Sequence, residues 1–212
     1  MYAYESLIDE LIKDGYLKTS GIIEAFKKID RKFFVPAKFQ DRAYVNEALP
    51  IGEEQTISQP LVVAFMTELL MVRPGEKILE VGSGSGWQTA ILAELVTGRD
   101  AHGKIISIER IPDLYASARE HCEQYGFMEK GVIQFFNGDG SRGYGQEAPY
   151  DKIIAAASGD VIPEAWKEQV RIGGRIVAPI KNSIVVLDKT AKDTFEQKEY
   201  FGFSFVPLIV GQ

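Results

Sequence analysis

Three closely spaced glycines are the residues of this sequence whose spacing points most directly to a chemical role. Gly82, Gly84 and Gly86 follow the apolar run at residues 78–81 and precede an apolar pattern typical of a helix. Glycine lets a ligand approach the bare backbone, and the N-terminus of the following helix presents free N–H groups and a partial positive charge. This stretch therefore predicts a strand, a turn and a helix that together bind a nucleotide-like cofactor.

The spacing of the glycines narrows the class of cofactor. A dinucleotide site needs the pattern G-x-G-x-x-G, and Trp87 stands where its third glycine would be. A P-loop needs Gly-Lys-Ser/Thr after its glycines, and no lysine follows here. The sequence at residues 80–86, E-V-G-S-G-S-G, instead resembles the first motif of class I S-adenosylmethionine-dependent methyltransferases. A glycine-rich turn in an unrelated α/β protein is the alternative.

An acidic residue ends the second predicted strand. Glu109 follows the strand pattern K-I-I-S-I at residues 104–108, and it stands about 23 residues after the last glycine, near the spacing at which an acid accepts ribose hydroxyls. The ends of neighbouring strands border the ligand crevice of a doubly wound sheet. We expect Glu109 to bind ribose, and a surface glutamate paired with Arg110 is the alternative.

A second acidic residue follows the third predicted strand, at residues 132–136. Asp139 stands there between Gly138 and Gly140, in a stretch typical of a tight turn. At the carboxyl end of a strand such a turn would face the same crevice. A plain turn without a ligand is the alternative.

The segment Q-T-I-S-Q-P at residues 55–60 precedes a helix predicted over residues 59–71. Pro60 suits the first turn of that helix. Ser58 is expected to be its N-cap, because a serine oxygen can accept a hydrogen bond from a free N–H at the helix start. The hydroxyl proton would still be available to a second partner.

This segment looks like the signature that precedes the cofactor motif in protein-L-isoaspartate O-methyltransferases. Four other pieces resemble motifs of that family in the same order, so that the resemblance covers nearly the whole chain. They lie at residues 33–36 (F-F-V-P), 44–52, 80–90 and 205–208 (F-V-P-L).

The resemblance implies transfer of a methyl group from S-adenosyl-L-methionine, with S-adenosyl-L-homocysteine as product. The acceptor would be the free α-carboxylate of an L-isoaspartyl residue, or the side-chain carboxylate of a D-aspartyl one, in damaged or flexible proteins and peptides. The ester would cyclise without enzyme to a succinimide, whose hydrolysis restores some normal aspartate. A carboxylate with a pKa near 4 is already ionised at pH 7 and needs no general base.

The resemblance also implies roles for individual residues. Ser58 is the candidate that donates to the substrate carboxylate, and Ile57 and Val206 are expected beside the substrate. The expected cofactor contacts are Thr56, Ile57, Glu80, Gly82, Ser83, Gly84, Gly86, Glu109, Gly138 and Asp139, the last two at the adenine. Residues 155–160 (A-A-A-S-G-D) depart from the family's T-A-A followed by prolines, so substrate contacts are not carried over to that loop.

Alternating strand and helix patterns predict an α/β fold with a Rossmann-like doubly wound, mostly parallel sheet and an antiparallel C-terminal strand. The 212 residues suit one methyltransferase domain. Residues 1–72 would form an N-terminal helical cap and substrate segment, and residues 73–212 the cofactor-binding core. Near the C-terminus we expect strands at residues 183–188 and 200–210, joined by an exposed polar loop at 189–197.

Composition disfavours several other classes of protein. The net charge of −6 and the lack of a Lys/Arg cluster disfavour nucleic-acid binding. No run approaches the ~18 apolar residues of a membrane span. Cys122 has no disulfide partner in the chain, and His102 and His121 lack the spacing of metal ligands. We expect a cytoplasmic monomer without a metal.

The open alternatives are a methyltransferase for tRNA or a small molecule, a non-catalytic cofactor-binding module, and an NAD-type oxidoreductase, which Trp87 argues against.

Overall fold

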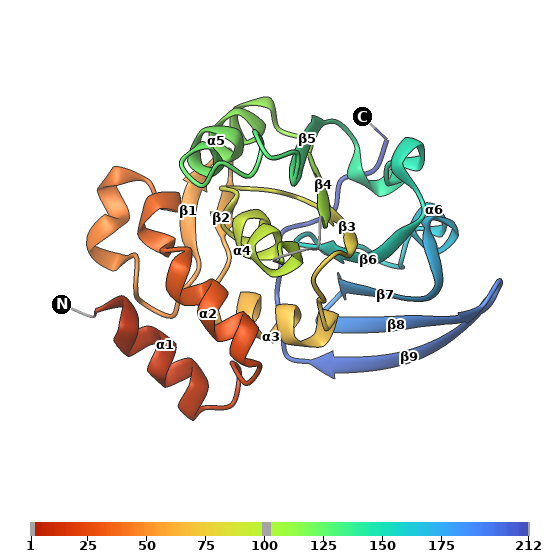
Figure 1. The fold of residues 1–212 in the computed structure, drawn as a ribbon, viewed down its shortest axis with the longest axis horizontal. Helices are drawn as coiled ribbons and strands as arrows, with labels where there is room; N and C mark the ends of the chain where they lie inside the picture. The colour runs from red at the N-terminus through yellow and green to blue at the C-terminus, as the bar shows by residue number, and fades with distance from the viewer. Residues whose placement is uncertain (1–2, 99–102, 212) are drawn as a thin grey trace.

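The computed structural model describes residues 3–98 and 103–211 of the chain. Its centre is a seven-stranded sheet in the order β5-β4-β3-β6-β7-β8-β9 (Figure 1). Strands β3 to β7 are parallel, and β8 and β9 are each antiparallel to the preceding strand. The predicted α/β fold is confirmed, with two antiparallel strands at its end. The strands are β3 (Lys77–Val81), β4 (Lys104–Glu109), β5 (Ile133–Asn137), β6 (Tyr150–Ala155), β7 (Val170–Ile180), β8 (Ser183–Ala191) and β9 (Thr194–Phe201).

Helices and a small hairpin surround this sheet. The α-helices are α1 (Tyr4–Lys13), α2 (Ser20–Lys28), α3 (Pro60–Leu70), α4 (Trp87–Val96), α5 (Pro112–Glu123) and α6 (Glu164–Gln169). Short 3-10 turns are η1 (Arg31–Phe34), η2 (Ala37–Arg42), η3 (Gly140–Arg142) and η4 (Gly145–Glu147). A two-stranded hairpin, β1 (Leu49–Gly52) and β2 (Gln55–Ile57), stands apart from the main sheet.

Two apolar cores lie on the two faces of the sheet. Consecutive residues of a strand point to opposite faces, so Ile78 and Leu79 of β3 enter different cores. Ile78 packs in the core that contains residues of α1 to α5. Leu79 packs in the core that contains Trp166 of α6. Burial on both faces explains why the central strands read as continuous apolar runs.

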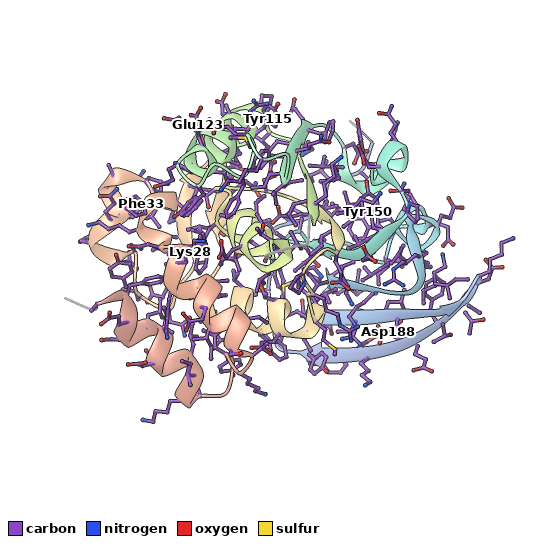
Figure 2. The ribbon with its side chains drawn as sticks, viewed as in Figure 1. Lys28, Phe33, Tyr115, Glu123, Tyr150 and Asp188 are labelled. Carbon is purple, nitrogen blue, oxygen red and sulfur yellow. The ribbon has the colours of Figure 1, made fainter. Side chains whose placement is uncertain are left out.

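The N-terminal segment before β3 packs directly on helix α4. Phe26 of α2 meets the Trp87 ring edge-on at 5.5 Å between centroids, and the Trp87 indole N–H donates to the Ile29 carbonyl at 3.1 Å. Lys28, labelled in Figure 2, forms an ion pair with Glu94 of α4 at 2.7 Å. The division of the chain into a cap and a core at residue 72 stays a prediction, and its ranges include residues outside the described part.

The expected polar loop at 189–197 and the expected strand at 200–210 are wrong. Strand β8 continues to Ala191 and pairs with β9 (Thr194–Phe201), in a register that sets Lys189 opposite Phe195. Residues 190–194 are polar or small and exposed, because this end of the hairpin projects past the rest of the sheet (Figure 1). Residues 202–211 form no strand. Phe203, Phe205 and Leu208 pack against the cores beside the sheet, whereas Val210 is 70% exposed.

Candidate active site

A cavity of about 650 Å³ lies at the carboxyl ends of β3, β4 and β6. The order of connection reverses between β3 and β6, and ligands of open α/β sheets bind at such a switch point. Residues of the β1–β2 hairpin, the start of α5 and the segment 204–209 form its walls. The predicted site residues that line it are Thr56, Ile57, Ser58, Gly82, Ser83, Gly84, Glu109 and Val206.

The glycine turn after β3 has the backbone conformation that its sequence predicts. Gly84 and Gly86 have φ angles of 54° and 88°, in the left-handed region that favours glycine. Gly84 lines the cavity, whereas Gly86 does not. A Cβ at Gly86 would lie 3.0 Å from the Ala118 carbonyl oxygen, so this glycine permits the close packing of α4 on α5. The expected contact of Gly86 with the cofactor therefore has no support from its position.

Glu80 lies beneath the turn rather than at the cavity. Its side chain is 0% exposed, and its Oε2 accepts hydrogen bonds from the hydroxyls of Thr89 (2.5 Å) and Ser107 (2.6 Å). Because the single proton of Ser107 is given to Glu80, the Ser83 hydroxyl donates to Ser107 at 2.6 Å. Burial raises the pKa of Glu80 to about 7. Glu80 thus ties β3, β4 and α4 together below the residues that face the cavity, which differs from the direct cofactor contact that we expected.

Glu109 combines a structural contact with a position at the cavity. Its Oε2 accepts from the Gly84 N–H at 2.9 Å and its Oε1 from the Ile111 N–H at 3.0 Å. A carboxylate has about four acceptor positions, so two stay available to a ligand. Ile108, Ile111 and Leu114 line the cavity beside it, and the sequence analysis missed them. The sequence feature that could have indicated them is the run of apolar residues on either side of Glu109.

Gly138 and Asp139 do not line the cavity, although the adjacent Gly140 does. The two carboxylate oxygens of Asp139 accept from the N–H groups of Ser141 (2.9 Å) and Gly211 (3.0 Å). Burial opposes ionisation here, but these hydrogen bonds and the charge of Arg142 outweigh it and hold the pKa of Asp139 below its ordinary value. Asp139 therefore fastens the C-terminal segment, which sequence-local reasoning could not anticipate.

The expectation that Ser58 caps helix α3 is wrong. The helix begins at Pro60 with Gln59 in the N-cap position, and no local side chain caps it. Asn46 supplies the cap instead, because its Oδ1 accepts from the Leu61 N–H at 3.0 Å. Across residues 3–98 and 103–211 the Ser58 hydroxyl has no hydrogen-bond partner. A free hydroxyl therefore lines the cavity.

The loop at residues 155–160 holds the C-terminal segment in place. The Ser158 N–H donates to the Val206 carbonyl, and the Leu208 N–H donates to the Ser158 carbonyl, both at 2.8 Å. Ala156 and Ala157 of this loop line the cavity, another contribution that the sequence analysis missed. The loop that departs from the family pattern thus still supports the segment that contains Val206.

The described residues contain neither a cluster of metal ligands nor a membrane-spanning helix. Within residues 3–98 and 103–211 no group of three or more His, Cys, Asp or Glu side chains could hold a metal ion. His102 lies outside these ranges. None of the described helices is long and apolar enough to cross a membrane. Cys122 is buried, and this burial raises the pKa of its thiol.

The cavity combines features that suit a nucleoside with an amino-acid tail. Bare glycine backbone borders it at Gly82 and Gly84, a carboxylate faces it at Glu109, and apolar side chains line the wall beside that acid. Ser58, whose hydroxyl has no hydrogen-bond partner among the described residues, lines the same cavity. This fold and this cavity are those expected of a class I S-adenosylmethionine-dependent methyltransferase.

Comparison with known proteins identifies the family within this class. The sequence model of the protein-L-isoaspartate(D-aspartate) O-methyltransferase family matches residues 2–212. The protein-L-isoaspartate O-methyltransferase of Methanopyrus kandleri is 42% identical over 98% of this chain and 91% of its own length. That of Halorhodospira halophila is 43% identical over 98% of this chain and 92% of its own length. The chain therefore belongs to the protein-L-isoaspartate(D-aspartate) O-methyltransferase family, and the predicted enzyme activity is confirmed.

A solved structure supports the fold separately. A protein-L-isoaspartate O-methyltransferase of Plasmodium falciparum, crystallised with S-adenosyl-L-homocysteine, covers 100% of this chain and of its own, with a TM-score of 0.89. At 20% sequence identity this likeness shows the fold alone. Both the cap helices and the sheet lie within the compared length.

Proposed function

We propose that this chain transfers the methyl group of S-adenosyl-L-methionine to the free carboxylate of L-isoaspartyl and D-aspartyl residues in damaged proteins and peptides, and that the cavity described above binds both reactants. Family membership supports the activity. One observation carries the assignment of the site. The Ser58 hydroxyl, which has no partner in the described protein, lines the same cavity as the glycine turn and Glu109.

The residues on one side of the cavity fit the cofactor. The carboxylate of Glu109 would accept the ribose hydroxyls, and Ile108, Ile111 and Leu114 would pack beside the flat adenine. The exposed backbone of the glycine turn would bind the amino-acid tail. When bound, S-adenosyl-L-methionine supplies a methyl group on a sulfonium, which is a good leaving group. The predicted adenine contact of Asp139 has less support, because Asp139, unlike Glu109, does not line the cavity.

The residues on the other side fit a carboxylate on an extended peptide. The Ser58 hydroxyl would donate to the substrate carboxylate and fix its direction, with Ile57 beside it. Residues 204–209 line the cavity in an irregular conformation, so main-chain contacts at Val206 could hold peptides of many sequences. The carboxylate arrives ionised. The protein therefore needs to align the reacting atoms and exclude water, and alignment alone can be worth about 7–11 kcal/mol.

The proposal includes action on damaged proteins by a cytoplasmic monomer that needs neither metal nor nucleic acid. The single cysteine fits a reducing compartment, and the net charge of −6 does not favour polyanions. The steps after methyl transfer need no residue of this chain, because the ester cyclises to the succinimide without enzyme.

Methyl transfer from labelled cofactor to paired peptides tests this proposal. One peptide contains L-isoaspartate and the other contains normal aspartate in the same sequence. We expect labelling of the first alone, and we expect the variant Ser58→Ala to label it at least about tenfold more slowly, because one hydrogen bond to a charged group is lost. Ser6→Ala, an exposed position on α1, is the matched control. Undiminished transfer in S58A would remove Ser58 from the site, and transfer to neither peptide would refute the proposed substrate.

A further inference from the structure

Arg31 is a fully buried arginine that has no acidic partner in the described part of the chain. Its side chain is 0% exposed. None of the ion pairs within residues 3–98 and 103–211 includes it. Its Nε is also buried without a hydrogen-bond partner. Burial of an unpaired charge is unfavourable, so the contacts that Arg31 makes must account for its place in the core.

The guanidinium group of Arg31 donates to carbonyl oxygens of two separate segments. One terminal nitrogen donates to Ala43 (2.7 Å) and Val45 (3.3 Å). The other donates to Glu47 (2.8 Å) and Ser58 (3.1 Å). The planar fork of an arginine can reach acceptors in two directions at once, whereas the compact ammonium of a lysine cannot. The side chain therefore joins residues 43–47 to the main chain of Ser58.

Two further contacts complete this arrangement around Ser58. Asn46, which lies between the acceptors of Arg31, holds the residues that follow Ser58: its backbone carbonyl accepts from the Gln59 side chain (2.9 Å), and its Oδ1 accepts from the Leu61 N–H (3.0 Å). The guanidinium also lies 5.4 Å from the centre of the Trp87 ring, at the start of α4 next to the glycine turn. Arg31 thus touches both the helix that follows the cofactor turn and the residue that faces the substrate.

We propose that Arg31 is a positioning residue for methyl transfer, which sets the direction of the Ser58 hydroxyl by holding the Ser58 carbonyl. This proposal rests on the proposed function, because Arg31 acts through Ser58. An arginine with a structural role alone would stabilise the fold, and its substitution would affect activity independently of the Ser58 hydroxyl. The two roles differ in whether the effects of changing Arg31 and Ser58 add.

A double-mutant cycle in the full-length enzyme distinguishes these roles. The variants are Arg31→Lys, Ser58→Ala and the combination, each measured for kcat and KM with an isoaspartyl peptide and for binding of S-adenosyl-L-homocysteine. We expect R31K to lower kcat/KM about 10- to 100-fold, because a small misplacement of a positioning group has effects of that size. We expect binding of S-adenosyl-L-homocysteine to change less than about threefold. The double variant should match S58A within about twofold, because the effects of coupled residues do not add.

Arg175→Lys is the matched control. Arg175 donates to both carboxylate oxygens of Asp188 (2.6 and 2.7 Å) and to the Leu69 carbonyl (2.7 Å), so it is as well connected as Arg31. It does not line the cavity, and Asp188, labelled in Figure 2, belongs to β8. R175K should lose stability without a selective loss of kcat/KM, and its effect should add to that of S58A.

The outcomes separate the two proposals. An S58A defect with a further, fully additive loss in the double variant would overturn the role of Arg31 and leave the proposed function intact. An S58A variant with wild-type kinetics would overturn the site and the role of Arg31 together. Should R31K fail to fold, Arg31→Ala with millimolar methylguanidinium replaces it. Recovery of kcat/KM at constant folded fraction is then expected, and recovery that only follows the folded fraction would overturn the proposal.

Discussion

Glu80 makes the stability of this protein depend on pH in an unusual direction. Its pKa rises from 4.5 to about 7, chiefly through burial, with the neighbouring Glu109 charge adding to the effect and hydrogen bonds from Ser107 and Thr89 opposing it. An acid whose pKa is raised on folding stabilises the protein fully below its unfolded pKa and loses that contribution as pH rises through the folded pKa. A rise of about 2.5 units corresponds to about 3 kcal/mol lost between pH 4.5 and pH 7.

The variant Glu80→Gln should remove this dependence without disturbing the packing. Both strong hydrogen bonds end on one oxygen, Oε2, and the amide oxygen of glutamine can accept both. We expect E80Q and wild type to have similar unfolding free energies near pH 4.5. Above pH 8 we expect E80Q to be more stable by about 3 kcal/mol, because the wild type must then bury a charge.

Urea unfolding between pH 4.5 and pH 9, followed by fluorescence of the buried Trp87 and Trp166, measures the difference. The comparison of two variants at each pH cancels the other titrating groups. Glu164→Gln, whose side chain is 72% exposed, is the control and should show no trend. A constant difference between E80Q and wild type from pH 4.5 to pH 9 would show that the Glu80 pKa is the same in the folded and unfolded chains, which would refute the reasoning.

Two further variants test single contacts of the site. Glu109→Ala should weaken binding of S-adenosyl-L-homocysteine about 10- to 100-fold in calorimetry, since a charged acceptor worth about 1.5–3 kcal/mol is removed, and an unchanged affinity would contradict its ribose role. Asn46→Ala should lower the unfolding free energy by about 1 kcal/mol, since it removes the acceptor of the Leu61 N–H. S58A should change the unfolding free energy little. A larger loss of stability in S58A than in N46A would restore Ser58 as the helix cap.

Features that depend on neighbouring residues were predictable from the sequence. The positive φ angles of the glycine turn, the buried central strands and the placement of Glu109 at a strand end all follow from short patterns, because backbone sterics and side-chain periodicity act within a few residues. The family motifs extended these predictions to Thr56, Ile57, Ser58 and Val206, which line the cavity.

Features that depend on which distant segments meet were decided by the tertiary structure. The N-terminus of α3 is capped by Asn46 rather than by Ser58, and Asp139 binds the N–H of Gly211 across 72 positions of sequence. A polar side chain takes the partner that folding brings within hydrogen-bond distance, so its own sequence neighbours do not determine its role. Local preferences therefore determined the sheet and the cofactor turn. Two features exist only because the chain packs as it does: the Ser58 hydroxyl, which has no partner among the described residues, and the buried charge that holds the Ser58 backbone.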